Sequence, residues 1–76
     1  MNDKRRRRLK KATSMINQAI QIIEEVRDEE QDSYDNLPES IMDGDRGAKM
    51  EEAIENMEDA LSDLESASEN IDNASV

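Results

Sequence analysis

The last third of the chain repeats itself every seven residues. Residues 50–76 align as MEEAIEN, MEDALSD, LESASEN and a truncated IDNASV. Apolar first and fourth positions in such a repeat are typical of a helix that packs against another helix. The first position holds Met50, Met57, Leu64 and Ile71, and the fourth holds Ala53, Ala60, Ala67 and Ala74. The repeat predicts one long acidic helix over residues 48–76, with an alanine-rich seam.

A second helix is predicted earlier in the chain, where apolar residues recur at alternating steps of three and four. These residues are Leu9, Ala12, Ile16, Ala19, Ile23 and Val26. We expect Ile16, Ala19, Ile23 and Val26 to meet the alanine-rich seam. Five larger residues widen the two apolar stripes and are expected to lie partly uncovered on the flanks: Met15, Ile20, Ile22, Ile54 and Leu61.

Residues 37–47 have the composition of a connection. Pro38 disfavours helix in the residue before it, and Gly44 and Gly47 admit positive φ. We expect the first helix to end near Asn36, residues 38–43 to form one short turn, and Asp45 to cap the second helix. A loop this short favours antiparallel neighbours.

The expected fold is therefore all-α: one domain that forms an antiparallel two-helix hairpin. A basic head over residues 1–11 continues into a helix over 12–36, followed by the loop at 37–47 and the helix at 48–76. The partly uncovered aliphatic residues predict that two hairpins pair into a four-helix homodimer. Because each acidic body carries many like charges, we expect salt to strengthen this dimer.

The composition argues against catalysis and metal binding. The chain has no Cys and no His, so disulfides, the usual zinc ligands and the usual neutral-pH base are missing. The pair Asp43 and Asp45 begins like a calcium loop. Positions 5, 6 and 12 of such a loop should supply a ligand oxygen, a glycine and a Glu, but here they are Gly47, Ala48 and Ile54. We expect a protein that is not an enzyme and binds no cofactor and no metal.

Charge divides the chain into two unequal parts. Residues 1–11 sum to +6, and residues 12–76 sum to −16. The basic head consists of Lys4, Arg5, Arg6, Arg7, Arg8, Lys10 and Lys11. In a hairpin these cations would lie beside the acidic end of the second helix and neutralise it. The competing interpretation is contact with nucleic acid or a membrane surface through phosphate groups.

The second helix carries the densest acidic cluster. Its candidate interaction residues are Glu51, Glu52, Glu55, Glu58, Asp59, Asp63 and Glu65. A rigid rod of carboxylates resembles a nucleic-acid backbone in charge and attracts basic partners. The plainer interpretation is the solvated face of a coiled coil.

Residues 28–67 contain the motif NLPES, a following RG and the heptads KMEEAIENMEDAL. In these features the stretch resembles small acidic helical proteins encoded by phages and prophages of Gram-positive bacteria. The resemblance implies a phage-type accessory role rather than a reaction.

Three functional hypotheses follow from these features. The first is an acidic protein that inhibits a basic, nucleic-acid-binding host defence protein by charge mimicry. The second is an assembly module that binds itself or another helical protein, and the third is nucleic-acid contact through the basic head. No apolar run approaches the roughly 20 residues of a membrane span and no signal peptide follows the head, so we expect residence in the cytoplasm of the bacterial host.

Overall fold

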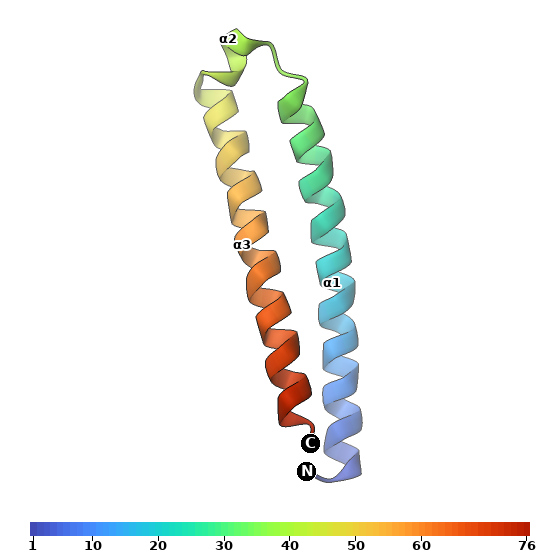
Figure 1. Ribbon diagram of the computed structural model, residues 1–76. Coiled ribbons are helices and arrows are strands. Elements are labelled where there is room, and N and C mark those ends of the chain that lie inside the picture. The colour runs from blue at the N-terminus through green and yellow to red at the C-terminus, as the bar shows by residue number, and fades with distance from the viewer.

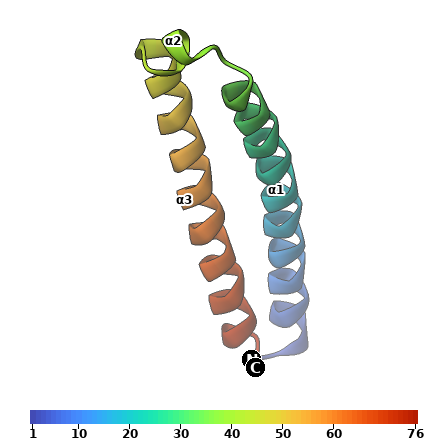
Figure 2. The same ribbon diagram turned by 45° about the horizontal axis from the view of Figure 1, so that its top comes forward.

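The computed structural model describes all 76 residues and consists of helices only. Helix α1 spans Asp3–Asp35, the single turn α2 spans Glu39–Met42, and α3 spans Asp45–Ala74. The all-helical class predicted from the sequence is confirmed. The two long helices run antiparallel side by side along a rod 58 Å long, with α2 at one end and both chain termini at the other (Figure 1). The turned view shows the same pairing along the length of the rod (Figure 2).

Helix α1 begins and ends at side-chain caps. The Asn2 side chain accepts a hydrogen bond of 2.9 Å from the Arg5 backbone N–H, which satisfies one of the free donors of the first turn. At the other end the Asn36 side chain donates to the Asp32 carbonyl at 2.8 Å. Pro38 follows two residues later, in extended conformation, and prevents the helix from continuing.

Helix α3 begins at Asp45, three residues before the predicted start at residue 48. The residue in the N-cap position is Gly44, so Asp45 is the first helical residue rather than the predicted cap. An acid in the first turn interacts favourably with the positive end of the helix dipole, which suits Asp45 to its place.

Gly47 is needed for close approach and not for positive φ. No glycine in the chain has positive φ, which corrects the role expected for these residues. Gly47 is buried in the first turn of α3, and a Cβ placed on it would lie 1.9 Å from the Met42 carbonyl oxygen. The backbone of α2 therefore rests directly on α3 at this residue.

The seam between the long helices keeps half of its predicted positions, including Met50 and Ile16, but each position predicted at an alanine or at Val26 is taken instead by the next residue. On α3 the most buried side chains are Ile54 and Leu61, 6% and 5% exposed, which we had expected on the flank. The row that faces α1 is Met50, Ile54, Met57, Leu61, Leu64, Ser68 and Ile71. On α1 the facing row is Leu9, Thr13, Ile16, Ile20, Ile23, Arg27, Glu30 and Tyr34.

The predicted seam residue Val26 is 45% exposed. Of the α3 alanines predicted at the centre, Ala53, Ala60 and Ala67 lie half-buried at the edge of the seam, and Ala74 is exposed. The physical reason is the size of the side chains. Burying an Ile or Leu contributes about 1.5–3 kcal/mol, much more than burying an Ala methyl group. The helices are therefore rotated so that Ile54 and Leu61, rather than Ala53 and Ala60, point at the partner helix.

Candidate functional site

The rotation of the helices gives the rod two chemically different long sides. In both helices the alanines beside the seam precede a seam residue by one position. In an antiparallel pair, the residues one position before the seam lie on the same long side of the rod in both helices. One step forward reaches the opposite side in both helices. Open grooves agree with this division, since Ala53 lines one groove with Glu30 and Lys49, whereas Glu51 and Glu58 line another.

We call the long side formed by the residues one position after the seam the polar side. It carries a row of four acids on α3, which we call the acidic row: Glu51, Glu55, Glu58 and Glu65. All are exposed, and none forms an ion pair. Successive heptad positions in this row lie about 10.5 Å apart along the helix.

The remaining acids of the predicted interaction face lie elsewhere on α3. Helical geometry places Glu52 and Asp59 on the back of the helix, away from α1. Asp63 lies two turns along from Asn56 and four turns along from Lys49, in the row that borders the alanines. The predicted face is therefore not one surface but the whole outer circumference of α3.

A single side-chain bond ties the acidic row to α1. The Tyr34 hydroxyl donates a hydrogen bond to a carboxylate oxygen of Glu51, across the end of the rod near α2. This bond raises the pKa of Tyr34, and desolvation and the negative charges of Glu51, Asp43 and Asp35 raise it further. The hydroxyl therefore remains protonated, and able to donate, to higher pH than an ordinary tyrosine.

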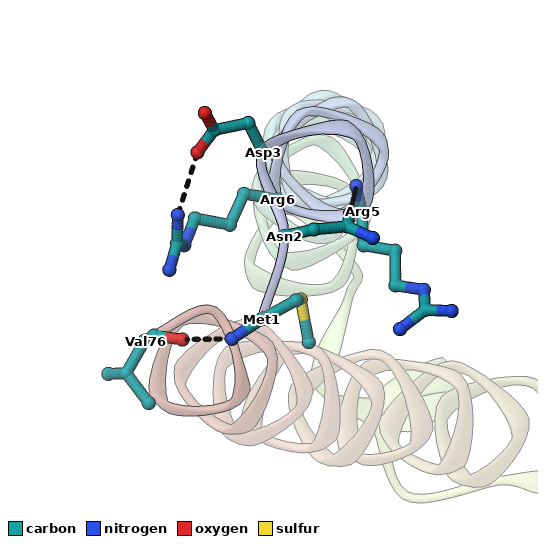
Figure 3. A network of polar contacts seen from close by, with 6 residues as sticks. All are labelled: Met1, Asn2, Asp3, Arg5, Arg6 and Val76. Atoms are coloured by element: carbon teal, nitrogen blue, oxygen red, sulfur yellow. Dashed lines mark hydrogen bonds and ion pairs between the residues drawn. The ribbon is translucent and has the colours of Figure 1, made fainter.

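The basic head lies at the end where the termini meet (Figure 3). The Met1 ammonium donates to the Val76 carbonyl at 3.1 Å, so the two ends of the chain are in contact. Arg6 and Lys10 line an open polar groove with Asp72. The head is thus beside the last turns of α3, as expected for an antiparallel pair.

The expected neutralisation does not take the form of direct pairs between the helices. The one ion pair made by the head joins Arg6 to Asp3 at 2.8 Å, within the first turn of α1 (Figure 3). The only other ion pair in the chain joins Arg27 to its neighbour Asp28 at 3.1 Å. All seven head cations are exposed, and six of them make no ion pair, so their charges are available to a partner.

The opposite side of the rod is apolar over residues 12–26 of α1 and along the alanines of α3, and we call this surface the apolar side. Its α1 members are Ala12, Met15, Ala19, Ile22 and Val26, and its α3 members are Ala53, Ala60 and Ala67. Met15 is 61% exposed, Ile22 60% and Val26 45%. Covering these three side chains would contribute about 2.5–5 kcal/mol per chain, scaling the full burial of each by its exposed fraction.

Sequence reasoning missed the link from Tyr34 to Glu51 and the composition of the apolar side. The missed signal is the size difference within each repeat, because Ile54 and Leu61 are larger than the alanines beside them.

No group of carboxylates is arranged to hold a metal ion, and no helix is long and apolar enough to span a bilayer. No protein family model, curated protein or solved structure matches the chain.

Proposed function

We propose that this chain is a non-enzymatic, phage-borne interaction protein that binds a basic, nucleic-acid-binding protein of its bacterial host and inhibits it by charge mimicry. We propose further that the protein acts in the host cytoplasm as a homodimer of antiparallel two-helix hairpins. The observation that carries it is the unpaired, exposed acid of α3, of which the acidic row is the most ordered part.

The charge density of α3 is close to that of a nucleic-acid strand. The seven candidate carboxylates fall within residues 51–65, and no Lys or Arg follows Lys49. These residues span about 21 Å of helix, or about one charge per 3 Å, whereas one strand of B-DNA carries a phosphate every 3.4 Å or so. A groove that binds duplex DNA electrostatically would therefore meet on α3 about half the linear charge density of its usual ligand, which carries one charge per 1.7 Å or so.

Rigidity distinguishes α3 from a disordered acidic tail. The acids lie on a continuous helix of 30 residues that contacts α1 and lies beside it (Figure 1). Their spacing is fixed before any partner arrives, so binding does not require the ordering of the chain that supplies them. A preformed row of charges is what a mimic of a stiff duplex needs.

A direct test compares two triple charge reversals with the same net charge. In one variant Glu51, Glu58 and Glu65 become Lys, and in the control Glu25, Asp28 and Asp32 on α1 become Lys. Each protein, immobilised, is used to capture host proteins at low salt, and bound material is eluted with salt or with duplex DNA. We expect the unchanged protein and the control to retain a basic protein that DNA elutes, and the α3 variant to lose it.

Two outcomes would contradict the proposal. One is equal retention by all three proteins, and the other is retention of a protein that duplex DNA does not elute. The competing role, an assembly module, is favoured by the apolar side rather than the acidic row. It predicts that the α3 reversal leaves the captured protein unchanged, whereas Ala60→Glu abolishes its capture.

A further inference from the structure

The charges of α1 are arranged in three consecutive blocks. Residues 4–11 contain seven cations and no acid, residues 12–23 contain no charged residue, and residues 24–35 contain seven carboxylates against Arg27. The uncharged block is the part of α1 that bears the exposed residues Met15 and Ile22. A helix with this order is complementary to a second copy of itself that runs in the opposite direction, because each basic block then faces an acidic one.

We infer that the apolar side binds a second copy of this chain, with the two α1 helices antiparallel and their two-fold axis close to Ala19. This inference rests on the proposed self-association and adds to it the surface, the direction and the register.

The register follows from the rows of α1 that form the apolar side. Arg8, Met15, Ile22 and Glu29 lie at heptad spacing in one row. Reversing this row about its centre places Arg8 on the Glu29 of the second copy and Met15 on the Ile22 of the second copy. The neighbouring row, with Ala12, Ala19 and Val26, reverses about Ala19 itself. A self-complementary surface of this kind is what a two-fold interface requires.

Side-chain size and charge support the same register. Ala19, at the axis, and the alanines of α3 beside it allow two rods to approach closely, while Met15 and Ile22 fill the space on either side. Arg8 and Glu29 lie about 15–17 Å from the axis and are both exposed and free of ion pairs. The symmetric dimer would contain two copies of this pair, one at each end of the apolar contact.

The acidic row lies on the far side of each rod, so it remains free when the apolar sides are joined. The dimer would then present acid on both outer surfaces and bury the least charged surface of the chain. The register also reverses the salt dependence expected from the sequence alone. The opposite charges are in contact, whereas the acidic rows are separated by the thickness of both rods and are screened at physiological salt. We therefore expect salt to weaken the dimer.

The test is a charge-swap cycle measured by sedimentation equilibrium from micromolar to submillimolar concentration. Arg8→Glu and Glu29→Arg each convert two attractive pairs into two repulsive ones. The double variant restores two attractive pairs, with the positive and negative charges exchanged. With about a threefold effect per pair, we expect each single variant to raise the dimer Kd about tenfold, and the double variant to return it close to the original value. Arg7→Glu with Asp28→Arg is the matched control, since these residues lie one step away, on the polar side.

The possible results separate the proposed register from the proposed self-association. A dimer whose Kd is unchanged by the single swaps, or is not restored in the double variant, would overturn this register but leave self-association standing. A folded chain that sediments as a monomer at submillimolar concentration would overturn both. The capture experiment with the α3 variants is independent of either result.

Discussion

Adding one methyl group at Gly47 provides a sharp test of how α2 rests on α3. In Gly47→Ala, the new Cβ would lie 1.9, 2.6 and 2.8 Å from the carbonyl oxygen, carbonyl carbon and Cα of Met42. All three atoms belong to the backbone, so no side-chain rotation can relieve the overlap, and α2 must move away from α3. Overpacking of this severity costs about 3 kcal/mol, the upper part of the usual range.

Helix propensity acts in the opposite direction at this position. Ala is favoured over Gly inside a helix by about 1 kcal/mol, so the net destabilisation expected for Gly47→Ala is about 2 kcal/mol. For a chain of this size that corresponds to a fall of roughly 8–16 °C in Tm. The assay is thermal and urea unfolding followed by circular dichroism, at one fixed protein concentration because dimerisation contributes to the apparent stability.

Gly44→Ala is the matched control, since the same methyl group there would lie 3.5 Å from the nearest atom, the Ile41 carbonyl oxygen. We expect it to change the free energy of unfolding by less than about 1 kcal/mol, because two effects oppose each other. Ala reduces the conformational freedom of the unfolded chain, which stabilises the fold, but it is a poorer N-cap residue than Gly, which destabilises it. If Gly47→Ala instead stabilises the protein by the amount that helix propensity supplies, the close packing of α2 on α3 is refuted.

Three further predictions concern single side chains and use the same unfolding assay. Because Tyr34 has a raised pKa in the folded chain, the stability that its bond contributes is fully present below the ordinary tyrosine pKa and is lost as pH rises through the folded pKa. Tyr34→Phe should remove this loss of stability at alkaline pH. If the variant shows the same dependence of stability on pH as the unchanged protein, the bond to Glu51 is contradicted. Leu61→Ala should cost about 2–4 kcal/mol, whereas Ser62→Ala on the exposed face should change stability by less than about 0.5 kcal/mol; equal effects would refute the rotated seam. Asn2→Ala should cost about 1 kcal/mol through loss of the α1 cap, and amide exchange in the first turn should speed up; unaltered exchange would contradict the cap.

Helix class and connection could be predicted from the sequence because their signals are local. A heptad repeat, an Asn-Leu-Pro sequence at the end of α1 and two glycines identify helices and a loop without knowledge of tertiary contacts. The sequence predicts the start of α3 at residue 48 rather than Asp45, because Gly44 has the character of a loop residue and its position as the N-cap depends on how α2 folds back.

The identity of the buried row could not be predicted from the sequence, because two neighbouring rows in each helix are apolar. Ala53 and Ile54 both recur at heptad spacing with apolar partners, and only the competition between rows in the paired helices decides which one is buried. The choice in turn determines what is left outside. It leaves Val26 at the surface and gives the chain its apolar side, which a seam centred on the alanines does not predict.

The measurement that tests the proposed function most directly is competition for the captured host protein. The partner is first bound to a fluorescently labelled DNA duplex, and this chain is then added while the anisotropy of the duplex is followed. Charge mimicry predicts that the chain displaces the duplex until the anisotropy reaches that of free DNA, and that the Glu51, Glu58 and Glu65 reversal fails to displace it. A stable ternary complex, in which anisotropy rises as the chain binds beside the DNA, would contradict the account.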